Sequence, residues 1–295
     1  MAVRPQLFEL DAAEAERLTG GRWLGAMRSV CLHGATVDSR RVRPGNLFVC
    51  VVGQQVDGHD YAATAVGDGA ALVLASRAID DELPVPVLLV DDVVPALAAV
   101  ARAFRQRYQG ATWIGVTGSN GKTTVKELLA AALADSGAVH CTAGNFNNQY
   151  GLPLTVLDTP PDRRYVIIEM GASGPGDIDH LASIVRPQIG VITGIGPAHL
   201  EGFGDLVGVA RGKSELFEHV AADGSCLFAR DGLEAVAAGC GADVDELLAI
   251  IRAAAGERQL TEVGGVGCAI DGEELPRGVL LRTPVGEVQL RLDGR

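Results

Sequence analysis

Aromatic residues and long uncharged apolar runs are both scarce in this 295-residue chain. Only 4% of the residues are aromatic although 47% are hydrophobic. The core must therefore be built largely from Val, Leu, Ile and Ala, as in an ordinary globular protein. No uncharged apolar run reaches the roughly 18 residues that are needed to cross a bilayer, so we expect no membrane insertion.

Paired cysteines and a secretory leader pattern are also missing. The N-terminus lacks the basic and apolar regions of a signal peptide. No two of the cysteines show the spacing of a metal or redox pair, and we expect them to act as small core hydrophobes in a reducing cytoplasm. The six lie at positions 31, 50, 141, 226, 240 and 268.

Positively charged residues are also scarce. The chain has 25 Lys and Arg residues against 37 Asp and Glu residues, which gives a net charge of −12. An acidic chain repels nucleic acid and anionic membranes, which excludes both as expected partners. Any anionic substrate must therefore be held by a few local basic residues.

The feature that stands out is Thr-Gly-Ser-Asn-Gly-Lys-Thr-Thr at 117–124. An apolar run at 113–116 precedes it and predicts a buried strand. Apolar residues at steps of three and four follow it and predict one core-facing side of a helix. These residues are Val125, Leu128, Leu129, Ala132 and Leu133.

A strand, a glycine-rich turn and a helix opening with Lys-Thr predict a phosphate-binding loop, since first-turn amides and the helix dipole favour an anion. The glycine spacing departs from a strict Walker A pattern, with Gly118 only three residues before Gly121. We expect Lys122 to contact the outer phosphates and the hydroxyl of Thr123 to bind Mg²⁺. The alternative is a glycine-rich turn with a surface lysine.

Two polar residues follow predicted strands of the same region. Glu169 ends the strand at 165–168, and His199 follows the strand at 189–193. Ligands of parallel sheets bind at the carboxyl ends of the strands, so Glu169 is predicted to bind Mg²⁺. The alternatives are a helix cap or ion pair for Glu169 and a surface histidine for His199.

Lys213 lies on the apolar stripe of a helix predicted at 206–220. A lysine on a core-facing stripe must extend to solvent, pair, or have a chemical role. The spacing leaves two interpretations open: an extended surface lysine, or a lysine that faces the nucleotide site.

The fold class that we predict is α/β, with a small mixed α/β N-terminal domain at 1–109 and a phosphate-loop central domain at 110–295. The central domain should have a mostly parallel sheet flanked by helices. In the first domain, Asp38-Ser39-Arg40 suits phosphate recognition, but from the residues alone a polar turn is favoured. Helices are predicted at 10–20, 61–66 and 97–108, and strands at 46–52, 71–75 and 87–90.

With these pieces in order, the chain resembles the Mur ligase family from about residue 20 to about residue 230. The stretches that carry the resemblance are Asp38-Ser39-Arg40, Pro44–Phe48, Asp57-Gly58-His59, Thr117–Thr124, Gly144–Asn148, Glu169-Met170-Gly171, Ala198-His199-Leu200 and Lys213.

The resemblance implies an ATP-dependent ligase of peptidoglycan precursor synthesis. A UDP-MurNAc-tripeptide would be activated by ATP as an acyl phosphate, and the amine of D-alanyl-D-alanine would then displace phosphate. It also implies these roles: ATP at Gly118, Ser119, Asn120, Gly121, Lys122, Thr123, Thr124 and Asn148; metal at Thr123, Glu169 and His199; the UDP part at Asp38, Ser39, Arg40 and His59; and a carbamylated Lys213.

The family has a C-terminal ligand-binding domain that we expect to be absent from these 295 residues. Two alternatives therefore stay open: a truncated or split nucleotide-binding protein that needs a partner protein to supply that domain, and a Mur-type ligase of another pathway. The asparagine-rich loop at 143–153 and the turn at 38–40 disfavour a generic phosphate-loop kinase.

Overall fold

The computed structural model describes residues 8–25, 29–79 and 82–264, and the backbone of three strands between 271 and 291. Residues 292–295, where the predicted central domain ends, lie outside the described residues. Contacts divide the chain into two compact units. The first holds residues 1–111 and 136–166, and the second holds 112–135 and 167–295.

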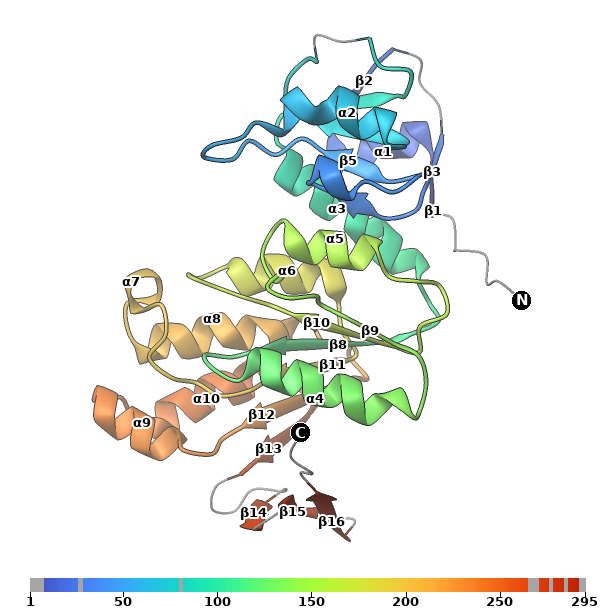
Figure 1. The fold of residues 1–295 in the computed structure, drawn as a ribbon. Helices are drawn as coiled ribbons and strands as arrows, with labels where there is room; N and C mark the ends of the chain where they lie inside the picture. The colour runs from blue at the N-terminus through green and yellow to red at the C-terminus, as the bar shows by residue number, and fades with distance from the viewer. Residues whose placement is uncertain are drawn as a thin grey trace. The chain divides into compact units, whose positions relative to one another are not determined.

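The first unit is built on a five-stranded sheet with the order β2-β7-β6-β5-β4. The pairs among β4 to β7 are parallel, and β2 runs antiparallel to β7. A separate antiparallel pair joins β1 and β3. The strand bounds are β1 Phe8–Leu10, β2 Arg22–Leu24, β3 Val30–Leu32, β4 Ala35–Thr36, β5 Leu47–Val49, β6 Leu72–Ala75 and β7 Val87–Leu89 (Figure 1).

The helices of the first unit begin and end at residues that suit those positions. Asp11 caps α1 by accepting hydrogen bonds from the amides of Ala13 and Glu14, and Gly20 ends it in the left-handed region. Asp92 caps α3, whose buried face includes Leu97 and Phe104 as predicted. The bounds are α1 Ala12–Thr19, η1 Ser39–Arg41, η2 Gly58–Tyr61, α2 Ala62–Gly67, α3 Val93–Arg107 and α5 Gly151–Leu157.

A six-stranded sheet with the order β13-β12-β11-β8-β10-β9 carries the predicted phosphate loop. The pairs β8–β11, β11–β12 and β12–β13 are parallel. The predicted fold class, α/β with a mostly parallel sheet flanked by helices, is confirmed. The bounds are β8 Thr112–Thr117, β9 Val139–Cys141, β10 Tyr165–Glu169, β11 Ile189–Ile192, β12 Ser225–Ala229 and β13 Gln259–Val263.

Helix α8 packs closely on this sheet because two strand positions are glycine. A Cβ at Gly115 of β8 would lie 2.9 Å from Leu216 Cδ1, and one at Gly190 of β11 would lie 3.1 Å from Phe217 Cδ1. Larger residues there would lift the helix. The helices of the second unit are α4 Lys122–Ala134, α6 Asp177–Val185, α7 Leu200–Phe203, α8 Leu206–Glu218, α9 Leu233–Cys240 and α10 Val244–Ala255.

The predicted core-facing side of α4 is wrong in part. Leu128 is 57% exposed and Ala132 is also exposed, whereas Lys126 is the buried residue of this helix. The apolar pattern could not reveal this, because it assumes that lysine faces solvent. Around the helix axis, Lys126 lies about a quarter of a turn from the middle of the predicted side.

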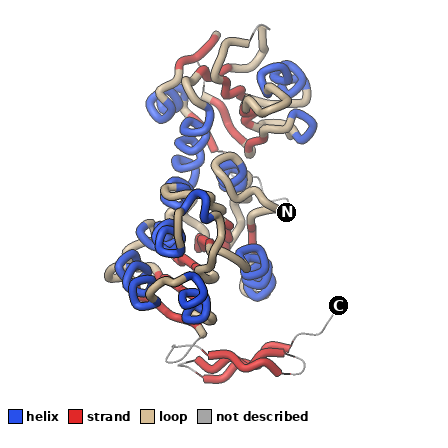
Figure 2. The backbone as a smooth tube through the Cα atoms, turned by 90° about the vertical axis from the view of Figure 1, so that its left-hand side faces the viewer, coloured by secondary structure: helices blue, strands red, loops and turns tan. Residues whose placement is uncertain are grey.

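The last described strands form a three-stranded antiparallel sheet, β14-β15-β16. Figure 2 shows it as three adjacent strands near the C-terminus. Its strands are Asp271–Leu275, Gly278–Thr283 and Gly286–Arg291. Within the described part of the chain, no helix has the length and apolar character that crossing a membrane requires.

Candidate nucleotide and substrate sites

The predicted phosphate loop joins the end of β8 to the start of α4. Gly118 and Gly121 both have positive φ angles, 144° and 76°, which favour glycine. Val125 is the first residue whose amide bonds back to the loop, to the carbonyl of Gly121. By helix geometry, the amides of Lys122, Thr123 and Thr124 have no acceptor within the helix. The loop therefore presents the donors that a phosphate needs.

A turn after β11 braces this loop. The hydroxyl of Ser119 donates to the carbonyl of Gly196 at 2.8 Å and accepts from its amide at 2.9 Å. A Cβ at Gly118 would lie 2.2 Å from Thr193 Oγ1, so only glycine fits. The predicted role of Ser119 in ATP binding stays a prediction, since its hydroxyl and its amide, which bonds to Gly194, hold the turn.

Lys122 folds back over the loop. Its ammonium donates to the carbonyl oxygens of Gly118 at 2.8 Å and Ser119 at 3.2 Å. Burial lowers the pKa of Lys122, and the negative charge of Glu169 acts in the opposite direction. The charge that sequence analysis assigns to the outer phosphates thus lies directly on the loop.

Glu169 and Thr123 meet beside the loop. The Thr123 hydroxyl donates to Glu169 Oε2 at 3.0 Å, and Lys126 Nζ lies 4.0 Å from the same oxygen. Glu169 and Lys126 are both buried. Sequence analysis missed Lys126, although its position four residues after Lys122 places both on one side of the helix.

A hydroxyl and a carboxylate are oxygen donors of the kind that Mg²⁺ prefers, so the pair of Thr123 and Glu169 fits that ion. His199 is exposed and precedes α7, with a left-handed φ of 53°. No group of three or more His, Cys, Asp or Glu side chains arranged for a metal occurs among the described residues. The predicted metal role of His199 stays a prediction.

Lys213 is only 1% exposed, so of the two interpretations left open by the helical stripe, the extended surface lysine is wrong. Its ammonium donates to the carbonyl of Ala172 at 3.3 Å and lies 5.1 Å from the centre of the Phe203 ring. The pKa of Lys213 falls to about 8, mainly because burial disfavours the ammonium and then because Lys122 is positively charged. Asp177 and Glu215 act in the opposite direction.

Two carboxylates hold the segment that faces Lys213. Glu215 of α8 accepts hydrogen bonds from the amides of Gly176 at 2.8 Å and Asp179 at 2.9 Å. Asp177 accepts from the amides of Ser173 and Gly174. These bonds place acidic groups at the start of α6, where the helix dipole favours them.

Asn148 belongs to the first unit, where its side-chain oxygen accepts from the amides of Tyr150 at 3.1 Å and Gly151 at 2.9 Å. It therefore caps the start of α5. Its predicted contact with ATP stays a prediction. Asn120 and Thr124 are exposed at the phosphate loop itself.

A cavity of about 410 Å³ in the first unit lies beside the predicted UDP-binding turn. Asp38, Ser39 and Arg40 line it, as expected for that role. Sequence analysis missed the apolar walls, which include the exposed side chains of Val56 and Tyr61. An aromatic ring, apolar walls and an arginine suit a planar base with an attached phosphate.

Arg40 is paired within the turn. Its guanidinium donates to Asp38 Oδ1 at 2.9 Å and Oδ2 at 2.8 Å. This pairing lowers the pKa of the Asp38 carboxyl and raises that of Arg40. The interpretation as a polar turn is thus correct for the local structure, and it leaves the binding role untested.

His59 lies behind the cavity wall, and its side chain has no exposed surface. Its Nδ1 lies 2.6 Å from Asp57 Oδ1, and its Nε2 accepts from the amides of Ser76 and Arg77. Both ring nitrogens are therefore used within the protein. The predicted contact of His59 with substrate stays a prediction.

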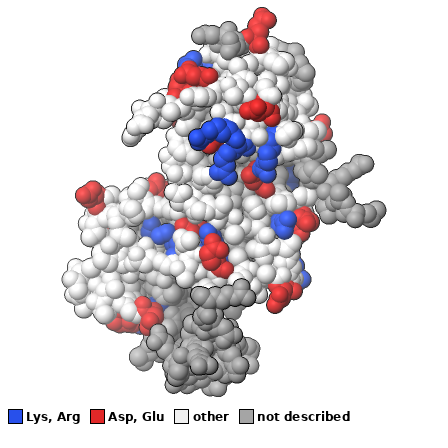
Figure 3. Space-filling view, in the orientation of Figure 1, with Lys and Arg blue, Asp and Glu red and all other residues white. Residues whose placement is uncertain are grey.

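A second cavity of the first unit, about 490 Å³, shares Val37 and Asp38 with the first. It is lined by Arg41, whose guanidinium lies 5.8 Å from the centre of the Phe146 ring. On the face that Figure 3 shows, Lys and Arg gather in small groups with acidic residues nearby, and no broad basic surface is seen.

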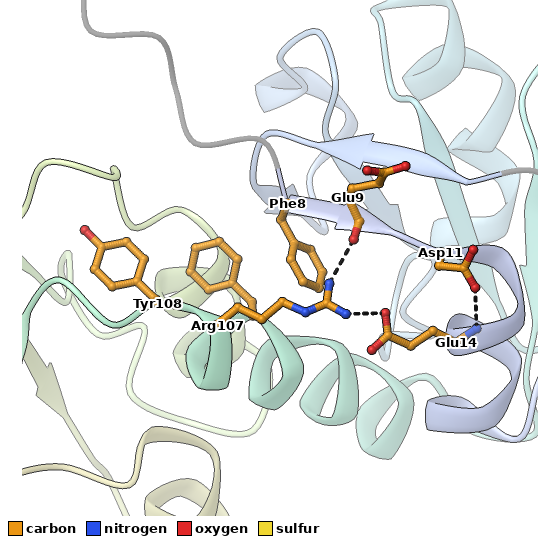
Figure 4. A pocket seen from close by; sticks show the side chains of 7 residues that line it. Phe8, Glu9, Asp11, Glu14, Arg107 and Tyr108 are labelled. Atoms are coloured by element: carbon orange, nitrogen blue, oxygen red, sulfur yellow. Dashed lines mark hydrogen bonds and ion pairs between the residues drawn. The ribbon is translucent and has the colours of Figure 1, made fainter.

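A third cavity, about 480 Å³, lies between β1, α1 and the end of α3 (Figure 4). Arg107 crosses it and pairs with the Glu9 carbonyl and the Glu14 carboxylate. Its guanidinium also lies 5.1 Å from the centre of the Phe8 ring. Since these groups satisfy one another, we assign this cavity a packing role.

Comparisons with known proteins agree with this geometry. Residues 32–105 match the Mur ligase family catalytic domain, and residues 116–239 match the Mur ligase middle domain. The UDP-N-acetylmuramoyl-tripeptide--D-alanyl-D-alanine ligase of Escherichia coli strain K12 is 40% identical over 225 residues, which are 76% of this chain and 49% of that protein. The Bacillus subtilis strain 168 ligase of the same name is 40% identical over 205 residues, with 68% and 44% covered.

Solved structures give the same result. A crystal structure of MurF from Acinetobacter baumannii superposes with a TM-score of 0.81 at 30% identity, covering 97% of this chain and 61% of that one. MurF from Thermotoga maritima in complex with ADP superposes with a TM-score of 0.71 at 29% identity, covering 88% and 58%.

The chain spans about half the length of the curated relatives that it matches. Within that span, the two family matches include the cavity-lining turn at 38–40, the phosphate loop and Lys213. This chain belongs to the Mur ligase family.

Proposed function

We propose that this chain provides the UDP-substrate-binding and ATP-binding parts of a ligase that joins D-alanyl-D-alanine to UDP-MurNAc-tripeptide. The observation that carries the proposal is the constellation of Lys122, Thr123, Glu169 and Lys213 around a glycine-rich loop at a helix start. The names of the relatives at 40% identity support this substrate choice.

ATP is the substrate that the loop suits best. The amides of Lys122 to Thr124 and the ammonium of Lys122 would hold the outer phosphates, because oriented donors and a fixed positive charge stabilise a phosphoryl group in transfer. Thr123 and Glu169 would hold Mg²⁺, with His199 as a further contributor. When bound there, the ion supplies positive charge to the phosphates.

The UDP part of the second substrate suits the first unit. We assign the base to the cavity of about 410 Å³ between Tyr61 and the turn at 38–40. Arg40 would exchange its partner Asp38 for a phosphate, which is a stronger acceptor for a guanidinium fork. His59 would keep the cavity wall in place through its bonds to the bend after β6 and to Asp57.

Lys213 would act as a carbamate. Carbon dioxide adds to a neutral amine, forming an N–C bond and releasing one proton, and a pKa of about 8 raises the neutral fraction near physiological pH. The product is an anion that would stand beside Lys122 in place of a second cation. Carbamate formation therefore removes the repulsion between the ammonium groups of Lys122 and Lys213, which contributes to the lowered pKa of Lys213.

The phosphate-loop assignment is tested by Lys122→Ala. We expect Mg·ATP affinity to fall at least about tenfold, since the variant loses a half-buried charge at the phosphates, and titration calorimetry measures this. Arg252→Ala, which removes an exposed arginine from α10 of the same unit, is the control for loss of one positive charge. Unchanged affinity in Lys122→Ala would refute the assignment.

The reaction is tested by measuring phosphate release from ATP with UDP-MurNAc-tripeptide, with and without D-alanyl-D-alanine. Phosphate release that requires both UDP-MurNAc-tripeptide and D-alanyl-D-alanine would support the proposed ligase reaction. The second candidate is a nucleotide-binding part that needs a partner chain. Binding of both nucleotides without phosphate release would favour this second candidate.

A further inference from the structure

Lys126 is a buried cation to which the proposed function assigns no role. It lies on α4 one turn after Lys122, and its side chain is 1% exposed. Its ammonium lies 2.9 Å from Glu127 Oε1 and 4.0 Å from Glu169 Oε2. Burying an ammonium is costly unless the charge is compensated, so its location requires an explanation.

The Glu169 oxygen nearest to Lys126 is the one that accepts the Thr123 hydroxyl, at 3.0 Å. Thr123 therefore fixes the direction of the carboxylate through a hydrogen bond. Lys126 contributes mainly charge at its longer distance. A divalent cation bound to Glu169 would lie close to the buried ammonium of Lys126. Both groups are positively charged, and their repulsion is strong because water is excluded.

We propose that Lys126 is a positioning residue that makes divalent-cation binding at Thr123 and Glu169 conditional on a bound nucleotide. The proposal rests on the proposed function. Without nucleotide, the ammonium balances Glu169 and disfavours a second cation. With nucleotide, the phosphates add negative charge that offsets Lys126, and the metal enters together with ATP.

The contacts of Lys126 predict which substitutions strengthen cation binding at Glu169 and which weaken it. Removing the Lys126 charge removes the repulsion between the ammonium and a divalent cation at Glu169, and this favours binding of the cation. The Thr123 hydroxyl would still orient the carboxylate. Neutralising Glu127, which is 63% exposed and paired with Lys126, should act in the opposite direction.

The test uses Mn²⁺ as the probe, the complete 295-residue chain, and electron paramagnetic resonance of free Mn²⁺ at mildly alkaline pH. Without nucleotide, Lys126→Met should bind Mn²⁺ at least about tenfold more tightly than the wild-type chain. With a non-hydrolysable ATP analogue, the wild-type chain should bind Mn²⁺ well. Glu127→Gln should bind it several-fold more weakly under both conditions.

Two controls separate the effect of the lost charge on Mn²⁺ binding from a loss of folded structure. Arg17→Met removes an exposed positive charge in the first unit and should leave Mn²⁺ binding unchanged. Circular dichroism and thermal unfolding report whether Lys126→Met folds. If it does not, Lys126→Gln, which removes the same charge but keeps a polar side chain in the buried site, repeats the comparison.

The outcomes distinguish this inference from the function on which it rests. If nucleotide-dependent Mn²⁺ binding is intact in the wild-type chain but Lys126→Met or Glu127→Gln leaves binding unchanged, the inference fails and the function stands. If the wild-type chain binds no Mn²⁺ with nucleotide, the metal site itself fails, and the inference with it.

Discussion

Lys213 has a basic nitrogen inside the second unit, where burial and the charge of Lys122 disfavour its protonated form. Its folded pKa, about 8, lies below its ordinary value of 10.5. Protonated Lys213 therefore destabilises the fold at pH values below about 8, and this cost is relieved as pH rises towards 10.5.

Lys213→Met should accordingly raise the free energy of unfolding at neutral pH, in buffer depleted of carbon dioxide. The expected gain is roughly 2–3 kcal/mol, since one pKa unit corresponds to about 1.4 kcal/mol. The gain should shrink as pH rises from about 8 to 10.5. Chemical denaturation at several pH values measures it.

If the difference in free energy of unfolding between the wild-type chain and Lys213→Met did not change with pH, packing and not charge would be its cause. Labelled bicarbonate gives a second readout. A protein-bound carbamate signal in carbon-13 NMR should appear with the wild-type chain and be absent from Lys213→Met. A wild-type chain without this signal would remove the carbamate from the proposed mechanism.

Residue roles could be predicted from the sequence where local spacing determines them. The helical stripe placed Lys213 on the core-facing side of its helix but left open whether the ammonium reaches solvent. The loop pattern and the strand end at Glu169 together predicted that Lys122, Thr123 and a carboxylate lie close to one another. His59 shows the limit. Its partners Ser76 and Arg77 come from the bend that directly follows the strand β6. No local pattern indicates such a contact, so its burial could not be predicted.

At the scale of elements, α7 and α8 meet through two glycines. A Cβ at Gly208 would lie 2.0 Å from the carbonyl oxygen of Phe203, and one at Gly212 would lie 2.3 Å from Phe203 Cε1. This close approach places the Phe203 ring over Lys213.

Gly212→Ala should therefore destabilise the second unit by about 1–3 kcal/mol, because the ring of Phe203 has to move. Gly239→Ala is the matched control. It also lies in a helix, but a Cβ there meets nothing within 4 Å, so the change should stabilise by about 0.5–1 kcal/mol. Opposite signs in thermal unfolding support the packing argument, and equal signs contradict it.

Helices and strands could be predicted where the apolar periodicity extended over many residues. The helices α3 and α8 and the strands β8, β10 and β11 lie where apolar spacing indicated. The buried side of α4 was not predictable, because Lys126 faces inward and Leu128 outward. That inversion depends on Glu169 of another strand, which binary patterning along one helix cannot include.

At the scale of the whole molecule, the proposed function assigns one nucleotide to each of the two units. The acidic chain confines positive charge to local groups, with the phosphate-loop lysines in the second unit and the arginines near the 38–40 turn in the first. The expectation is that each nucleotide protects the backbone of one unit.

Hydrogen exchange with mass spectrometry tests this division. Mg·ATP should slow exchange at 117–124 and 193–199, because the amides of the loop and of the turn that braces it are ordered together. UDP should slow exchange at 38–40 and 51–61, which line the cavity of about 410 Å³. Lys122→Ala should lose the first effect and keep the second. Protection of the phosphate loop by UDP, or of the 51–61 segment by ATP alone, would contradict the assignment of one nucleotide to each unit.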